Sequence, residues 1–186
     1  MPIELVKPAL DYLPSYVDAL KRGWSPDNIR GLEVTLDQLA AIERGAVAFV
    51  DGLNDPEAKG PPIKMPDGSL QKRLPGIRRW IWDGELAGSI GLRWQEGTSA
   101  LPPHVLGHIG YAVVPWKAGR GYATRALALT LDEARRRGLD HVVITTDPDN
   151  VASQKVVLAN GGVLVERFTK DAMYGGGENL RFRIDL

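Results

Sequence analysis

Apolar positions recur every three or four residues in three stretches of this chain, which is the spacing of a helix that buries one face. The stretches are 11–22, 35–44 and 121–137, and a glycine follows each of them. Thr35 begins the second stretch and Gln38 stands three residues on, which is the arrangement of a helix N-cap. The pattern therefore predicts three amphipathic helices with defined ends.

Runs rich in β-branched and aromatic residues predict the strands. Asp83 and Gly84 join two of these runs as a hairpin turn would. Trp80 and Trp82 share one face of the first run, which favours cross-strand packing over an aromatic box for a ligand. A fourth helix is predicted at 150–159, because an asparagine begins it. The predicted strands are 3–6, 77–82, 86–94, 108–114, 142–146, 163–168 and 180–186.

Residues 51–76 hold five prolines and several glycine turn signals, so no regular element is expected there. Either this segment is a surface loop, or it forms a lid or wall over a substrate cleft. No repeat and no second-domain boundary is visible in the sequence. We expect one domain over residues 1–186, of the α/β (α+β) class.

Composition narrows the function classes. The 23 basic residues equal the 23 acidic ones, and a neutral chain argues against general binding to nucleic acid or to an anionic membrane. No apolar run approaches the roughly 20 residues of a membrane span, and the N-terminus lacks the build of a signal peptide. Cysteine is absent, which fits a reducing compartment, so we expect a cytoplasmic protein. Three histidines without cysteine leave little for a structural zinc site, and no metal is expected.

The most informative segment is a strand that leads through a proline and a glycine-bearing turn into the helix at 121–137. Gly119 and Gly121 permit positive φ and a close approach of the backbone to a ligand. The amides of 119–124 would then face one spot, which suits a pyrophosphate. The phosphate-binding pattern with Gly-Lys-Ser or Gly-Lys-Thr is absent, and the dinucleotide pattern needs Gly or Ala where this chain has Thr124.

This order of parts resembles the acyl-CoA site of the GNAT superfamily of N-acetyltransferases. The family pattern Q/R-x-x-G-x-G/A falls on Ala118, Gly121 and Ala123, with a departure at its first position. A second family signature, an asparagine that starts the next helix with a small residue three positions on, matches Asn150 and Ser153. Those two residues could also serve only as helix caps. The resemblance implies acetyl-CoA as co-substrate, bound by Val113, Val114, Gly119, Arg120, Gly121, Tyr122, Ala123, Thr124, Asn150 and Ser153.

The resemblance covers residues 77–168 well and is nearest to the branch that includes ribosomal-protein acetyltransferases. It implies the GNAT fold, a mixed and mostly antiparallel twisted sheet of about six to seven strands flanked by about four helices. It also implies an amine acceptor, from a small molecule or a peptide N-terminus, and homodimers are common in the family.

Acetyl transfer to an amine needs a base for the amine, a donor to the thioester oxygen and an acid for the leaving thiolate. The glutamate that many family members use as base aligns with His108, for which a place in the core is the alternative. The backbone N–H of Val113 or Val114 is the candidate donor. The tyrosine that often acts as acid corresponds to Val157, so the candidate acid is Tyr174 in the glycine-rich loop, for which a surface tyrosine is the alternative.

Three functions compete at this stage. The leading hypothesis is an acetyl-CoA-dependent N-acetyltransferase that acts on a primary amine by direct attack in a ternary complex. The second is a non-catalytic acyl-CoA-binding sensor or interaction module, which the departures at Ala118 and Val157 leave open. The third is an unrelated nucleotide-binding α/β protein. The balanced charge does not select among acceptor amines.

Overall fold

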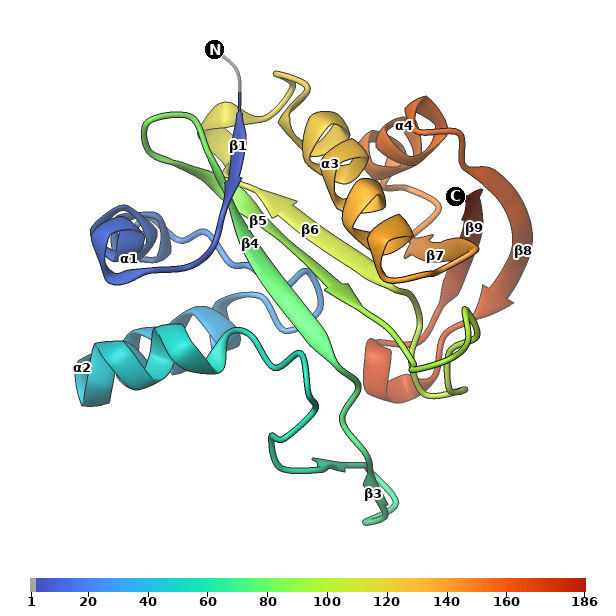
Figure 1. Ribbon diagram of the computed structural model, residues 1–186, viewed down its shortest axis with the longest axis horizontal. Coiled ribbons are helices and arrows are strands. Elements are labelled where there is room, and N and C mark those ends of the chain that lie inside the picture. The colour runs from blue at the N-terminus through green and yellow to red at the C-terminus, as the bar shows by residue number, and fades with distance from the viewer. Residues whose placement is uncertain (1–2) are drawn as a thin grey trace.

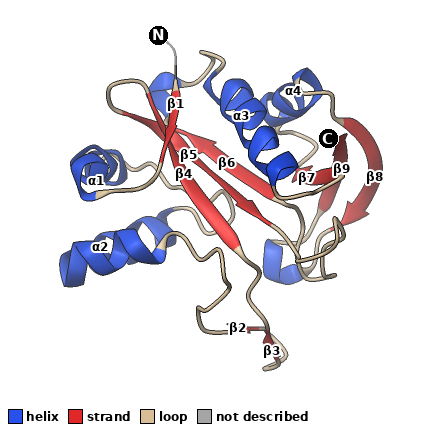
Figure 2. Cartoon of the chain, in the orientation of Figure 1, coloured by secondary structure: helices blue, strands red, loops and turns tan. Residues whose placement is uncertain are grey.

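The computed structural model describes residues 3–186, and its strands form two main sheets with helices on both sides (Figures 1 and 2). The first sheet is antiparallel in the order β1-β4-β5-β6, and the second has the order β7-β9-β8. Every predicted strand exists, and each boundary lies within two residues of the expected one. The bounds are β1 Glu4–Val6, β4 Gly76–Trp82, β5 Leu86–Arg93, β6 Ile109–Val113, β7 His141–Thr146, β8 Val163–Thr169 and β9 Glu178–Asp185.

Helices cover both faces of the first sheet and build a separate core on each. On one face α1 and α2 pack against the sheet, and the ring of Tyr16 stacks on Trp80 with centroids 4.5 Å apart. The tryptophans therefore pack in the core, as the alternation predicted. On the other face Leu127 and Leu131 of α3 pack against Ile90 of β5, and the same core extends to the second sheet. The helices are α1 Leu13–Lys21, α2 Leu32–Gly52, α3 Tyr122–Arg136 and α4 Val151–Ala159.

The start of α2 differs from its prediction. The helix begins after Gly31, so Thr35 lies inside it and is not its N-cap. The Thr35 hydroxyl instead donates to the carbonyl of Trp24 at 3.0 Å, a tertiary contact that a local pattern does not contain. At Gly45, the expected end, the backbone leaves the helical region (φ 175°, ψ 94°), but helical turns resume up to Gly52.

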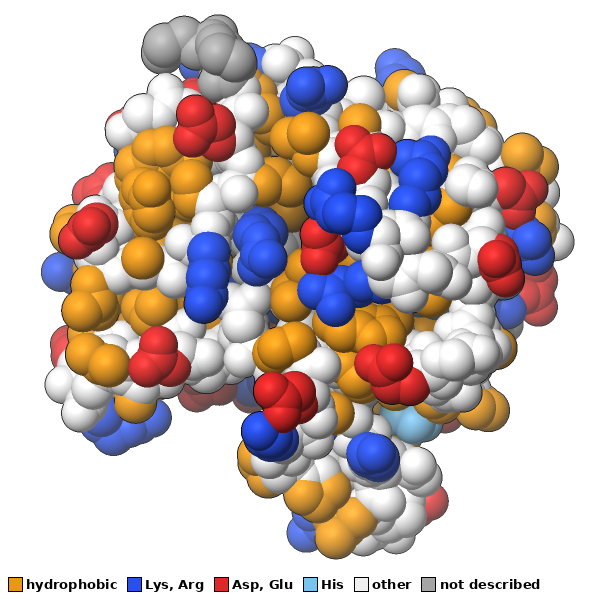
Figure 3. Space-filling model, viewed as in Figure 1, with side chains coloured by type: hydrophobic (Ala, Val, Ile, Leu, Met, Phe, Trp, Pro, Cys, Tyr) orange, Lys and Arg blue, Asp and Glu red, His pale blue; other side chains and the backbone are white. Residues whose placement is uncertain are grey.

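The proline-rich segment 51–76 is not wholly irregular. It carries a short hairpin, made of β2 Ile63–Lys64 and β3 Leu70–Gln71, that projects from the body of the protein (Figures 1 and 3). Reciprocal main-chain hydrogen bonds of 2.9 Å between Asp55 and Gly76 close its base. The expectation of no regular element was wrong for these two strands, because the residues between the prolines still pair.

Strands β6 and β7 contact each other at one end only, and a cavity lies next to this junction. The backbone N–H of His108 donates to the carbonyl of Val143 at 2.8 Å. Beyond that point a cavity separates the two strands. Because β6 pairs with β5 on one side, the edge of β6 that faces β7 keeps main-chain groups available to a ligand.

The surface agrees with the composition. Figure 3 shows basic and acidic side chains interspersed over the visible face, as a chain without net charge predicts. Arg135 and Arg136, at the C-terminal end of α3, pair with Asp132 and Glu133, so this basic run is a solvated helix end. None of the helices in the described part of the chain is both long and apolar enough to cross a membrane.

Candidate active site

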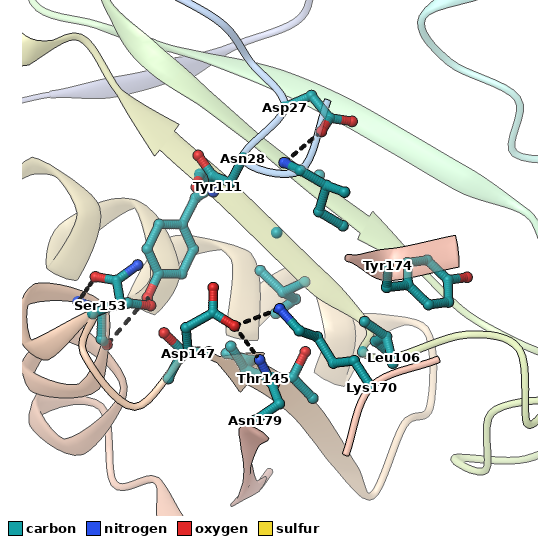
Figure 4. Close-up of a pocket in the computed structure, with 18 of the residues that line it drawn as sticks. Asp27, Asn28, Leu106, Tyr111, Thr145, Asp147, Ser153, Lys170, Tyr174 and Asn179 are labelled. Atoms are coloured by element: carbon teal, nitrogen blue, oxygen red, sulfur yellow. Dashed lines mark hydrogen bonds and ion pairs between the residues drawn. The ribbon is translucent and has the colours of Figure 1, made fainter. Parts of the chain in front are cut away.

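A cavity opens where β6 and β7 part (Figure 4). Its walls come from segments far apart in the sequence, including the loop 26–29 after α1, Arg78 of β4 and Arg93 of β5. The end of β7 at 144–147 and the segment around Tyr174 form the opposite side, together with the start of α4. A polar cavity at a strand junction, with free main-chain groups along one edge, is the candidate active site.

The start of α4 reaches this cavity. Asn150 and Ser153 both line it, and Asn150 Oδ1 accepts a hydrogen bond from the Ser153 N–H at 3.0 Å. The two residues therefore cap the helix and also face the cavity. Ser153 Oγ lies 2.9 Å from the hydroxyl of Tyr111, a β6 residue (Figure 4). Burial raises the pKa of Tyr111 more than the Ser153 hydrogen bond lowers it, so this hydroxyl is protonated at neutral pH.

The two candidate main-chain donors at the end of β6 differ. The N–H of Val114 donates to the carbonyl of Ala87 at 2.9 Å, so it is not available to a thioester, and that expectation was wrong. Successive residues of a strand direct their main-chain groups to opposite sides. The N–H of Val113 therefore faces away from β5, as does the carbonyl of Tyr111, which accepts from Asn28 Nδ2 at 3.1 Å.

The glycine turn has the geometry that the sequence predicts. Gly119 and Gly121 have φ values of 76° and 78°, and Gly121 is the residue that precedes the first turn of α3. Within residues 3–186, no main-chain or side-chain acceptor bonds the amides of 119–124. The turn does not line the cavity itself but follows the end of β6 beyond it. A ligand that touched both would have to be long.

A buried ion pair fixes the base of this turn. Lys117 Nζ lies 2.6 Å from Asp83 Oδ1 and 2.9 Å from Glu85 Oε1, and the hydroxyl of Tyr122 donates to Asp83 Oδ2 at 2.7 Å. The side chains of Lys117 and Asp83 are each 5% exposed. Burial raises the pKa of Asp83, but hydrogen bonds from Lys117 and Tyr122 outweigh it, so that the pKa is lowered. The β4–β5 hairpin thus holds both ends of the glycine turn.

His108 does not lie in the cavity, although its neighbours Gly107 and Ile109 line it. The side chain is completely buried, and its Nδ1 accepts a hydrogen bond from the N–H of Val143 at 2.9 Å. Burial is the largest of the causes that lower the pKa of His108 to about 4. The imidazole is therefore neutral at pH 7 and holds the strand junction together, which favours the core alternative over the role of base.

Tyr174 lines the cavity, but its hydroxyl donates to the carbonyl of His104 and points away from Tyr111 and Asp147 in Figure 4. Burial raises the pKa of Tyr174. A role as acid would require this hydroxyl to leave its main-chain partner. Asp147, on the opposite wall, pairs with Lys170 and accepts from Asn179 Nδ2 at 2.7 Å. The negative charge of Asp147 is therefore neutralised by Lys170, which lines the same cavity.

Sequence reasoning missed the side chains that most distinguish this cavity, which are Asp27, Arg78, Arg93 and Tyr111. A signal was present for the two arginines, because each follows a glycine by two residues on a predicted strand. Such spacing places a long cationic side chain beside bare backbone on one face of the sheet. Asp27 lies in a turn sequence, where its Oδ1 accepts from the amides of residues 29 and 30. Nothing in the linear pattern places it near the arginines.

A protein-family model described as an acetyltransferase (GNAT) domain matches residues 67–163, just over half of the chain. The chain belongs to the GNAT acetyltransferase family. The matched segment includes the glycine turn, both strands that border the cavity and the whole of α4. Family membership confirms the expected enzyme class, an acetyltransferase. Among curated proteins, none matches the sequence.

Solved GNAT structures share the fold over nearly the whole chain. The microcin self-immunity acetyltransferase MccE, in complex with acetyl-CoA and AMP, is 15% identical, with 99% of this chain and 92% of that chain covered and a TM-score of 0.64. RimL, a ribosomal alpha-N-protein acetyltransferase in complex with coenzyme A, is 18% identical, with 100% and 95% covered and a TM-score of 0.63. A putative ribosomal-protein-serine acetyltransferase from Vibrio cholerae is 15% identical, with 99% and 94% covered and a TM-score of 0.61. The expected GNAT fold, with mostly antiparallel strands and four helices, is confirmed.

Proposed function

We propose that this GNAT acetyltransferase uses acetyl-CoA and transfers the acetyl group to a primary amine, of a small molecule or a peptide N-terminus, by direct attack in a ternary complex. The observation that carries the proposal is the row of free amides at 119–124, at the end of a strand whose open edge borders a cavity. MccE and RimL, whose structures hold acetyl-CoA and coenzyme A, support this choice of co-substrate. The two cores on the two faces of one sheet support a single catalytic domain.

The glycine turn fits the pyrophosphate of acetyl-CoA. A Cβ built on Gly119 or Gly121 would meet no atom within 4 Å, so the turn presents bare backbone to open space. Its amides and the N-terminal dipole of α3 favour a paired phosphate group, and Arg120 adds a positive charge. Ala118, where the family pattern has Gln or Arg, leaves these donors intact because they belong to the main chain.

The edge of β6 and the start of α4 would hold the rest of the co-substrate. The pantetheine arm carries amides, which need hydrogen-bond partners along its length, and the free main-chain groups of β6 supply them. Asn150 and Ser153, at the start of α4, line the same cavity. The thioester supplies an activated acetyl group, and the N–H of Val113 would donate to its carbonyl oxygen as negative charge develops there.

Asp27 is the carboxylate that we assign to the incoming amine. Its Oδ1 accepts from the amides of residues 29 and 30, at 2.7 Å and 2.8 Å. No basic side chain of the described residues pairs with it, so its other oxygen is available. Asp27 would hold the ammonium form of the acceptor and take its proton through water. His108 is replaced in this role because its imidazole lies in the core.

Tyr111 is the acid that we assign to the leaving thiolate. Its hydroxyl lies beside Ser153, at the end of the cavity nearest the start of α4, and it is protonated at neutral pH. Both hydroxyls reach a main-chain carbonyl, that of Ser153 for Tyr111 at 3.3 Å and that of His104 for Tyr174. Tyr174 is the less favourable choice because its hydroxyl points away from Tyr111 and Asp147 (Figure 4). Cysteine is absent from the sequence, so no thiol of the protein can form an acyl intermediate, which supports direct transfer.

Two measurements test the proposal. Acetyl-CoA and CoA should raise the melting temperature, whereas ATP and NAD should not, and stabilisation by ATP or NAD alone would refute the coenzyme assignment. A panel of primary amines should then release free thiol from acetyl-CoA at a rate that depends on the amine. Mass spectrometry should find the acetyl group on the amine and not on the protein.

A non-catalytic acyl-CoA sensor is the second candidate. Val157, which takes the position of the usual acid, and His108 are both completely buried in the core. This alternative predicts tight CoA binding without amine-dependent thiol release from any member of the panel. The same two measurements therefore separate the two functions.

A further inference from the structure

Two arginines share one face of the first sheet beside the cavity. In the β4–β5 register Arg78 pairs with Gly91, and Arg93 pairs with Gly76. Each arginine is therefore opposite a residue without a side chain, and the two lie on a diagonal of the same face. Both line the cavity between β6 and β7, and both also line an adjoining cavity next to the 51–76 segment.

Glycines make the floor between these arginines and β6. A Cβ built on Gly91 would lie 3.4 Å from Arg78 Cζ, so the guanidinium covers the place that a side chain would take. Gly91 pairs in turn with Gly110 of β6, where a Cβ would meet nothing within 4 Å. The result is a bare strip of backbone that leads from the Arg78 guanidinium to the open edge of β6. A small acceptor can lie on this strip.

The positive charge on this strip has no acidic partner in the described part of the chain. Neither Arg78 nor Arg93 forms an ion pair there. Of the acids near the cavity, Asp147 pairs with Lys170, Asp55 accepts from two main-chain amides, and Asp27 acts on Arg93 only through its charge, without an ion pair. The Arg93 side chain is open to solvent, yet the walls around it remove part of its hydration, and this burial together with the charge of Arg78 lowers its pKa. An anion bound between Arg78 and Arg93 would compensate for the lost hydration of Arg93 and for the repulsion between the two positive charges.

We propose that the acyl acceptor is a compact amine that also carries an oxyanion, a carboxylate or a phosphate, which Arg78 and Arg93 bind while Asp27 holds the amine. This inference rests on the proposed function and names its acceptor class. Arginine forks match both oxyanions. Neighbouring strands are about 4.8 Å apart, so an anion at the Arg78 guanidinium over β5 lies roughly one strand spacing from the reacting edge of β6. The amine and the anion must therefore belong to one small molecule, such as an amino acid or an aminoalkyl phosphate.

The test is binding of matched amines to the CoA-loaded protein by calorimetry, followed by turnover with acetyl-CoA. The probes are α-, β- and γ-amino acids with their amides, and aminoalkyl phosphates with their alcohols. We expect at least one anionic amine to bind tenfold or more tightly than its neutral counterpart. Arg78→Gln and Arg93→Gln should each weaken that binding about 10- to 100-fold, since each removes charge-assisted hydrogen bonds. The affinity for acetyl-CoA should stay unchanged, which shows that the variants are folded.

Arg136→Gln is the matched control, because it removes the same charge from an exposed position at the end of α3. It should bind every probe as the wild type does. The carboxylate and phosphate arms distinguish the two oxyanions. Equal affinity for anionic and neutral partners, or preserved preference in both arginine variants, would overturn the inference even if amines are acetylated. Selective anion binding without turnover would uphold the oxyanion site at Arg78 and Arg93 and would refute the proposed function instead.

Discussion

The two halves of the candidate cleft are built in different ways. The proposed coenzyme half, residues 113–124, is one continuous segment in which a strand end, a glycine turn and a helix start present main-chain donors. The proposed acceptor half takes Asp27, Arg78 and Arg93 from three separate segments and places their side chains over a glycine floor. One half is therefore a property of local backbone conformation, and the other is a property of tertiary assembly.

This difference determines what each half can tolerate. Main-chain donors survive changes of side chain, which is why Ala118 can stand where the family pattern has Gln or Arg. The acceptor half has no such protection, because replacing a single arginine changes its charge. Within a shared fold, the coenzyme half can therefore remain constant while the acceptor half changes its substrate.

The substitution Gly121→Glu should break the coenzyme half alone. It adds a negative charge at the proposed pyrophosphate position and a side chain at a residue with φ of 78°. We expect the affinity for acetyl-CoA to fall at least about 1000-fold, or roughly 4 kcal/mol. Gly138→Glu is the matched control, since Gly138 has φ of 76° and open space around it but lies at the other end of α3. Calorimetric titration of both variants with acetyl-CoA separates the effect of a charge at the turn from the effect of backbone strain. A similar loss of affinity in the two variants would refute the pyrophosphate site at Gly121.

The substitution Lys117→Met should remove the ion pair that connects the β4–β5 hairpin to the glycine turn. It leaves Asp83 buried without its cation, which typically costs about 3 kcal/mol of unfolding free energy. The equivalent change at Arg136, which pairs with Glu133 but is 66% exposed, should cost less than about 1 kcal/mol. Urea unfolding of both variants measures the difference. If Lys117→Met keeps wild-type stability, the turn does not depend on this ion pair.

Low pH should weaken the same ion pair between Lys117 and Asp83. The pKa of Asp83 is lowered in the folded protein, so the stabilisation that it provides is present above its unfolded pKa, about 3.9, and is lost as the pH falls through the lower folded value. The stability difference between the wild type and Asp83→Asn should therefore be constant from pH 7 to pH 5 and shrink below about pH 4. If the stability difference between the wild type and Asp83→Asn stays constant below pH 4, the ionised Asp83 carboxylate is not what stabilises the fold here.

The sequence predicts the backbone conformation of the proposed coenzyme half well because its signals are local. Strand β6, the proline, the glycines and the cap at Asn150 are close together in the chain, and each acts through the conformation of its own residues. The errors arose where a distant segment decides the outcome. Thr35 bonds to Trp24 instead of capping a helix, and the Val114 N–H pairs with Ala87. For His108, which the sequence left open between base and core residue, the strand junction favours the core.

The acceptor half could not be assembled from the sequence for the same reason. Arg78 and Arg93 come together only through the register of the β4–β5 hairpin, and Asp27 joins them only when α1 packs on the sheet. The hairpin itself was predicted, so the spacing of each arginine from a glycine was a usable signal. The position of Asp27 required the tertiary structure.

His108 lies between the two halves, and its role is tested by pH. Because burial lowers its folded pKa to about 4, the neutral imidazole stabilises the fold fully above the unfolded pKa of about 6.5. This stability is lost as the pH falls from there toward 4, at about 1.4 kcal/mol for each pH unit at most. The stability advantage over His108→Gln should therefore fall by about 2 kcal/mol between pH 7 and pH 4.5. Turnover by this variant at pH 7 should keep the wild-type rate if it folds, and a large loss of rate with normal stability would return His108 to the role of base.

The smallest effect is expected at Tyr111, which connects the two halves along β6. Tyr111→Phe keeps the ring and removes the hydroxyl that lies 2.9 Å from Ser153 Oγ. We expect about a tenfold lower rate of amine acetylation with unchanged affinity for CoA, because a thiolate is a fair leaving group even without an acid. Thioesters with a more acidic thiol should reduce the deficit toward zero, since their leaving group needs no proton. Tyr174→Phe is the matched control, and it should retain the wild-type rate with every thioester because its hydroxyl is bonded to the carbonyl of His104. If the lower rate is found in Tyr174→Phe and not in Tyr111→Phe, the acid is Tyr174, on the acceptor side of the cleft. The separation into a coenzyme half and an acceptor half would then not hold at β6.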